Sequence, residues 1–194
     1  MGSTRYVLDA KSSQLTVQAF AEGLAGIAEH RPRFWIRDFV GEAELDLAKM
    51  SGALQLTAKT ESLALMDEMA ERDRQSIDRV MFEEILHAKS FPEVGFRSSK
   101  IVCKPLDENR YSADIAGMVS LHGVENAQSI QAQMVLNEGS LRAYGEFRLR
   151  QTDYGLKIAS VAGGMIRIKD ELKFVFFIVG REMGREMGRE RGGA

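Results

Sequence analysis

Histidine and cysteine, which often perform catalysis or bind metal ions, are few and far apart in this chain of 194 residues. Its three histidines are His30, His87 and His122, and none stands in an H-x-x-x-H or H-E-x-x-H pattern or at a metal-ligand spacing from the cysteine or a carboxylate. Serine, histidine and aspartate all occur, but no G-x-S-x-G motif marks a nucleophilic serine. The sequence therefore predicts no resident metal ion, no cofactor and no catalytic residues, so we do not expect an enzyme.

The composition narrows the expected partners and compartment. The 26 basic and 28 acidic side chains leave a net charge of −2, so no overall field attracts nucleic acid or anionic membranes. Cys103 is the only cysteine, which excludes an intramolecular disulfide, is compatible with a reducing compartment and suggests a buried, unreactive thiol. No signal-type apolar run opens the chain, and no stretch has the ~18 consecutive apolar residues of a membrane span. We expect a cytoplasmic protein without a nucleic-acid partner or a membrane span.

The elements that would position the remaining side chains are predicted to be mostly β-strands. Asparagine and glycine in the stretch NEGS indicate a β-hairpin between the last two of the alternating segments. A chain of this length fits one domain with a sizeable core, which we place at residues 1–180. The tail, residues 181–194, repeats Gly-Arg-Glu-Met and is predicted to be a disordered, low-complexity extension. Apolar and polar residues alternate with the two-residue period of a strand in residues 14–20, 34–40, 53–59, 111–121, 130–136 and 141–149.

Helical periodicity is visible in one part of the chain. Residues 63–72 are rich in helix formers, and apolar residues recur at helical spacing from Ile77 to Ile85. Pro92 prevents the helix from continuing and is followed by alternation typical of a strand. The sequence thus predicts one or two short helices that cover part of a mainly β structure.

The apolar faces of several predicted strands contain unusually small residues. An eight-stranded barrel can either fill its interior with side chains or hold one ligand there, and small inward residues favour the ligand. The alternative is that the glycines are bends or bulges and that the alanines lie beneath large neighbours. The small residues are Ala113, Gly117, Ala132, Ala143 and Gly145.

The last predicted strand differs from the others because it is apolar on both faces. Residues 174–179 read FVFFIV, and a strand that is apolar on both sides must be covered on both. We expect its outer face to meet the helix or a second subunit.

Several short segments together resemble the YceI-like family of lipocalin-like, polyisoprenoid-binding proteins, over about residues 5–180. Any one of them alone would be weak evidence. The segments are YVLD at 6–9 with SS at 12–13, FVGE at 39–42, FPEVGFRSS at 91–99, GMVSLHGV at 117–124 and RQTDYG at 150–155.

The resemblance implies a mainly β fold: an extended eight-stranded antiparallel barrel with one or two short flanking helices. It further implies that the interior carries an isoprenoid-like or other amphiphilic chain, that the protein is commonly a homodimer, and that it performs no reaction. Two features of secreted members are replaced here. Those members often carry a histidine soon after the opening aspartate, where this chain has Ala10-Lys11, and another in the following strand, where it has Ala19-Phe20. A polar anchor for a head group is therefore expected elsewhere, with His30 and Arg148 as candidates.

We predict that the protein binds or sequesters a long apolar ligand without catalysis. The alternative is a protein interaction module with a filled barrel, which dimerises or docks a partner through its apolar outer strand. The helix that carries Met81, Phe82 and Ile85 would lie across an open end or along the wall, with Phe91-Pro92 as its hinge. The predicted ligand contacts are Phe34, Ile36, Leu54, Leu56, Met81, Ile85, Ile115, Val119, Met134, Phe147, Phe174 and Phe176.

Overall fold

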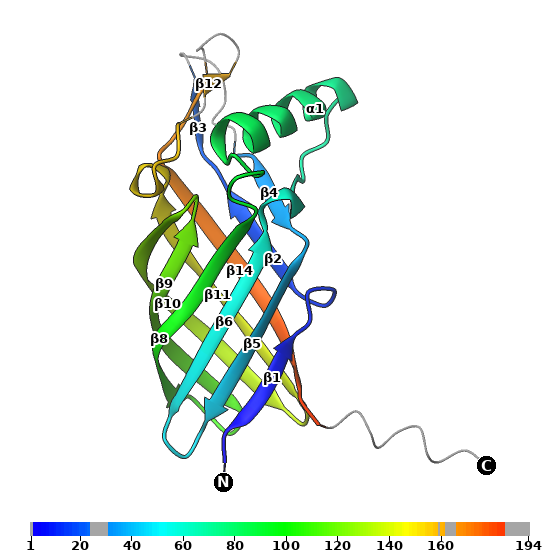
Figure 1. Ribbon diagram of the computed structural model, residues 1–194. Coiled ribbons are helices and arrows are strands. Elements are labelled where there is room, and N and C mark those ends of the chain that lie inside the picture. The colour runs from blue at the N-terminus through cyan, green and yellow to red at the C-terminus, as the bar shows by residue number, and fades with distance from the viewer. Residues whose placement is uncertain (1, 24–30, 159, 162–165, 185–194) are drawn as a thin grey trace, which may run out of the picture.

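The computed structural model describes residues 2–23, 31–158, 160–161 and 166–184, and its chain is dominated by antiparallel β-strands (Figure 1). The helical elements are η1 (Thr60–Ser62), α1 (Glu71–Arg79), η2 (Val80–Ile85) and η3 (Gln151–Tyr154). The strands are β1 (Thr4–Leu8), β2 (Gln14–Gln18), β3 (Ala21–Gly23), β4 (Arg33–Ile36), β5 (Phe39–Asp46), β6 (Ser51–Lys59), β7 (Leu63–Leu65), β8 (Glu93–Pro105), β9 (Arg110–Leu121), β10 (Val124–Asn137), β11 (Ser140–Arg150), β12 (Ser160–Val161), β13 (Ile166–Ile168) and β14 (Glu171–Glu182).

The main sheet closes on itself into an eight-stranded antiparallel barrel, as the sequence predicted. Its closure depends on β14, which pairs with β11 on one side and with both β1 and β2 on the other. Strands β1 and β2 therefore act as one interrupted strand. The same holds for β4 with β5, which pair with β2 and β1, and for β7 with β6, which pair in turn with β4 and β5. A small separate sheet of β12, β13 and β3 lies beyond one end of the barrel (Figure 1).

Strand alternation sorts the side chains between the interior and the outer surface. In β9 the inward residues Ala113, Ile115 and Val119 are buried, whereas the intervening Asp114 and Met118 are exposed. The predicted hairpin at residues 137–140 is confirmed, since Asn137 pairs with Ser140 and Gly139 adopts φ = 74°. The buried apolar residues form two adjoining clusters inside the barrel.

The helical prediction is correct in its second half and wrong at its start. Leu63–Leu65 is the strand β7, which pairs with β4 through Leu65 and Phe34. Tertiary pairing overrides the helix propensity of this short stretch. The helix proper comprises α1 and the π-helical turn η2, residues 71–85, and we call it the covering helix. Arg74 ties it to the chain after β6 by donating hydrogen bonds to the carbonyl oxygens of Leu65 and Asp67, at 2.8 and 3.0 Å.

The last strand extends slightly further than the predicted domain boundary at residue 180. Arg181 and Glu182 belong to β14 because they pair with Val7 and Tyr6 of β1. The rest of the predicted tail, from residue 185, lies outside the described residues.

Candidate functional site

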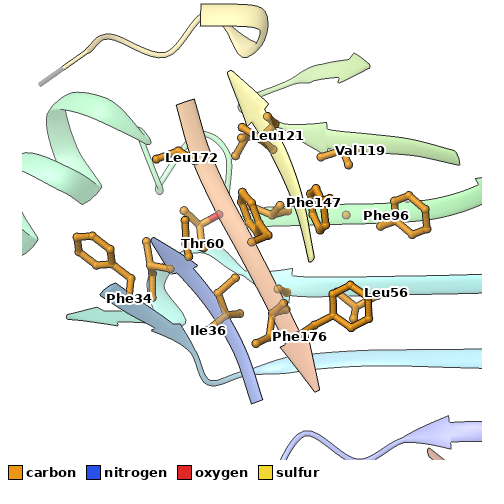
Figure 2. A pocket seen from close by; sticks show the side chains of 18 of the residues that line it. Phe34, Ile36, Leu56, Thr60, Phe96, Val119, Leu121, Phe147, Leu172 and Phe176 are labelled. Atoms are coloured by element: carbon orange, nitrogen blue, oxygen red, sulfur yellow. The ribbon is translucent and has the colours of Figure 1, made fainter. Parts of the chain in front are cut away.

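A cavity of about 670 Å³ occupies the interior of the barrel. Its walls are formed by inward side chains of the strands, many of them large and apolar (Figure 2). The rings of Phe147 and Phe174 stack within it, with centroids 4.8 Å apart. The volume lies within the range of roughly 300–1,000 Å³ that is typical of single-ligand pockets.

The structure brings all twelve predicted ligand contacts together around this cavity. They come from β4, β6, the covering helix, β9, β10, β11 and β14, so residues far apart in sequence share one space. Whether they contact a ligand stays a prediction. The twelve are Phe34, Ile36, Leu54, Leu56, Met81, Ile85, Ile115, Val119, Met134, Phe147, Phe174 and Phe176.

The small inward residues differ in what they contribute to the cavity. Ala132 and Ala143 line it directly. By contrast, a Cβ atom added to Gly117 would lie 2.6 Å from the ring of Phe96, and one added to Gly145 would lie 2.7 Å from the ring of Phe176. These two glycines therefore give no empty space but let two phenylalanine rings pack closely against their backbone. Ala113 is buried in the core cluster beside the cavity.

The covering helix lies across one end of the barrel (Figure 1). Five of its residues line the cavity, namely Ser76, Ile77, Val80, Met81 and Ile85. Phe82, which the same helix carries, is only partly buried and is not a lining residue. Of the two positions that the sequence left open, the helix occupies the one across the end.

Polarity in the described lining is confined to the end of the barrel under this helix. Strands β6 and β11 run in the same direction, so their last residues reach the same end. Thr60 and Gln151 follow these two strands and are both buried, whereas Lys59 and Ser76 are exposed at the rim. At the other end, Leu45, Leu141 and Ile178 are apolar.

Neither candidate anchor is placed at the cavity. Arg148 points outward, because it alternates with the inward Phe147, and it forms an ion pair with Glu171 and lies 5.9 Å from the ring of Phe20. His30 lies outside the described residues.

The sequence-based predictions missed the polar residues that do line the buried end, Thr60 and Gln151. Each continues the alternate positions of the preceding strand whose side chains point inward. A polar residue on an otherwise apolar parity was the signal that could have found them.

The described interior offers little chemistry beyond hydrogen bonding. No cluster of three or more histidine, cysteine or acidic side chains occurs among the described residues, and burial raises the pKa of the Cys103 thiol, which keeps it protonated. Many shifted carboxyl groups are on the outer surface, such as Asp114, whose pKa is lowered by its hydrogen bond and ion pair with Lys104. In the part of the chain that the structure describes, no helix is long and apolar enough to cross a membrane.

Comparison with solved structures finds the same barrel in proteins of low sequence identity. The structure of BcnA from Burkholderia cenocepacia matches with a TM-score of 0.66 at 18% identity, over 89% of this chain and 98% of that one. A polyisoprenoid binding domain from Saccharophagus degradans, described as implicated in plant cell wall breakdown, matches with a TM-score of 0.63 at 12% identity, over 91% and 98%. A YceI protein from Campylobacter jejuni matches with a TM-score of 0.54 at 13% identity, over 76% and 82%.

No curated protein matches the sequence significantly. A comparison with protein families, however, identifies a YceI-like domain over residues 6–179, which is nearly the whole barrel and agrees with the fold of the solved structures. The chain therefore belongs to the family of YceI-like domains.

Proposed function

We propose that this protein binds one long apolar or amphiphilic molecule, an isoprenoid-like chain or another lipid, inside its barrel and does not alter it chemically. The observation that carries the proposal is the cavity of about 670 Å³, whose described walls are apolar over most of their length. Burial of each methylene-like carbon stabilises a complex by about 0.8 kcal/mol before the costs of association. A long chain therefore gains affinity mainly from its length.

The comparisons support the same class of ligand. The Saccharophagus degradans domain with this fold is described as polyisoprenoid-binding, and we extend that ligand class to this chain as a proposal. The twelve lining residues predicted from the sequence are proposed to contact the ligand chain.

The test is a titration of the delipidated protein with a long-chain isoprenoid, read out by calorimetry and by native mass spectrometry. We expect saturable binding of one chain per barrel. Ile115→Trp places a larger side chain in the cavity and should weaken binding at least about tenfold, or ~1.4 kcal/mol. Met118→Trp is the matched control, because Met118 lies on the same strand but faces outward. Equal binding by both variants would overturn the proposal of an interior site.

A second candidate function, protein association, is favoured by the outer face of β14. Val175 and Phe177 are exposed there, and Phe177 pairs across the sheet with the exposed Tyr144. These three side chains form an apolar surface of the kind used in homodimers. We propose a homodimer through this surface, without the filled barrel of the original alternative. Analytical ultracentrifugation should show a dimer that Phe177→Glu dissociates; a monomeric wild-type protein that still carries lipid would exclude this role.

We also propose a cytoplasmic location. It is supported by the single cysteine, which is free and buried as expected of a protein in a reducing compartment. Fractionation of the host cell tests it, and recovery from an extracytoplasmic fraction would contradict it.

A further inference from the structure

We infer that the cavity selects a ligand whose head group is neutral and donates a hydrogen bond, such as the hydroxyl of a long-chain alcohol, and binds that group beneath the covering helix. The inference rests on the proposed function and adds the chemistry and orientation of the ligand. Its basis is the pair of buried polar side chains Thr60 and Gln151, together with the ion pairs in which the nearby cations are engaged.

The orientation follows from how polarity is distributed along the cavity. The end beneath the covering helix contains Thr60 and Gln151, while the described lining at the opposite end is apolar, with Leu45, Leu141 and Ile178. A buried polar head group without a hydrogen-bond partner is costly. The tail of an amphiphile is therefore stabilised at the apolar end and its head group beneath the helix.

Gln151 presents an acceptor that is not used by the protein. The residue is only 6% exposed, and its Nε2 donates to the carbonyl oxygen of Lys169 at 2.9 Å. Its backbone groups are also used, since its N–H donates to Asp170 and its carbonyl accepts from Leu156. Within the described residues, Oε1 has no hydrogen-bond partner. Among the described residues no side-chain oxygen or nitrogen is both fully buried and without a partner, so Oε1 of Gln151 keeps some accessible surface and can accept a hydrogen bond from a ligand that brings a donor.

Thr60 presents a second acceptor. It is 5% exposed, and its hydroxyl donates to the carbonyl oxygen of Phe91 at 2.8 Å. Because its proton is committed to this bond, the Oγ1 atom can only accept from a ligand. Figure 2 shows Thr60 among the side chains that line the cavity. Thr60 thus favours a donor, while the amide of Gln151 offers an acceptor oxygen and, besides the N–H that is bonded to Lys169, a second N–H. A hydroxyl head group can use both kinds of group, whereas an ether or a ketone can only accept.

The charged groups near this end disfavour an anionic head group. Lys59 is the one cation in the described lining, and its exposed Nζ lies 2.6 Å from Asp38 in an ion pair. Arg148 and Arg150 lie on the outer surface and pair with Glu171 and Asp170. A phosphate or carboxylate beneath the helix would therefore be desolvated in a lining whose one described cation, Lys59, is already paired with Asp38, which is strongly unfavourable.

The test is a matched ligand series that shares one apolar chain: farnesol, its methyl ether and farnesyl monophosphate, each titrated into the delipidated wild-type protein. We expect farnesol to bind about tenfold more tightly than the ether, as one hydrogen bond to a buried acceptor predicts, and also more tightly than the monophosphate. Ether or monophosphate binding as tight as that of farnesol would overturn the inference while leaving the proposed function intact. No binding of any of the three would overturn the proposed function.

Variants of the protein test which residue causes the preference for farnesol over its methyl ether. Gln151→Met removes the amide at similar size and should reduce the preference for farnesol over its methyl ether, with Thr60 left as the remaining acceptor. Gln133→Met is the control, because Gln133 is exposed on the outer face of β10 and its loss should leave the preference unchanged. A Gln151→Met protein that keeps the full preference would overturn the role of Gln151. If that variant does not fold, Thr60→Val tests the second acceptor in the same way, and the wild-type series alone still decides the head-group class.

Discussion

The Nδ1 atom of His87 lies 2.8 Å from the Nε2 atom of His122, which joins the end of the covering helix to the turn between β9 and β10. The two rings stack at 5.1 Å, and Phe91 packs on His122 at 4.4 Å. The other nitrogen of His122, Nδ1, lies 3.3 Å from the carbonyl oxygen of Tyr154. Because a carbonyl only accepts, Nδ1 of His122 is the donor there, so in the neutral ring Nε2 accepts from His87.

This contact predicts coupled effects of the two histidines on the covering helix. Both have positive φ, 44° at His87 and 54° at His122, which asparagine tolerates. His122→Asn should therefore keep the turn, lose the bond and lower the free energy of unfolding by about 1 kcal/mol. Hydrogen exchange at the amides of Leu86 and Ala88 should accelerate.

A double-mutant cycle provides the control for this prediction. His87→Asn should lose only its contact with His122, whereas His122→Asn also loses the contacts with Tyr154 and Phe91, so the double variant should be little worse than His122→Asn alone. Fully additive losses would contradict a direct interaction between the two rings.

Gly145 is predicted to be intolerant of any side chain. An added Cβ would lie 2.5 Å from the carbonyl oxygen of Gln131 and 2.7 Å from the ring of Phe176. Gly145→Ala should therefore lower the free energy of unfolding by about 1–3 kcal/mol through overpacking. Gly95→Ala is the matched control, since its Cβ would have no neighbour closer than 3.8 Å. Equal denaturation midpoints in urea for the two variants would refute this account of the glycine.

Cys103 is predicted to react slowly with thiol reagents while the barrel is folded. It is buried, its amide donates to the carbonyl of Met50 at 2.9 Å, and burial raises the pKa of its thiol, so little thiolate forms at pH 8. Alkylation should be on the order of 10³-fold or more slower than in the unfolded chain, because it requires opening of the barrel. Labelling of the native protein at the rate of the unfolded one would contradict the buried position.

Asp9 is predicted to make part of the stability dependent on pH. Hydrogen bonds from Ser12 and then the contact with Arg181 lower its pKa, and these contacts stabilise the break between β1 and β2. A group whose pKa is lower in the folded state stabilises the fold above its unfolded pKa, and this contribution is lost as the pH falls through the folded value. Asp9→Asn should cost about 1 kcal/mol at neutral pH and flatten the stability profile in acid. Urea denaturation from neutral to acidic pH measures both, and an unchanged acid profile in the variant would contradict the role of Asp9.

The alternation of residues was enough to predict most of the barrel wall. In a strand, successive side chains point to opposite faces, so Ile115 and Phe147 could be assigned to the interior without knowledge of their neighbours. The motifs at residues 91–99 and 117–124 indicated the family, and the resemblance to that family predicted that eight strands close into a barrel. Both predictions depend on local patterns, which the chain carries in consecutive residues.

Only the tertiary structure decided the features that depend on pairing between distant segments. The register that places Gly145 opposite Phe176, the strand pairing of Leu65 with Phe34, and the position of the covering helix across the barrel end all join residues far apart in the chain. The same holds for Gln151, whose inward parity was visible in the sequence but whose unused acceptor depends on its bond to Lys169. Periodicity determines which face a side chain occupies, whereas closure of the barrel determines which side chains it meets there.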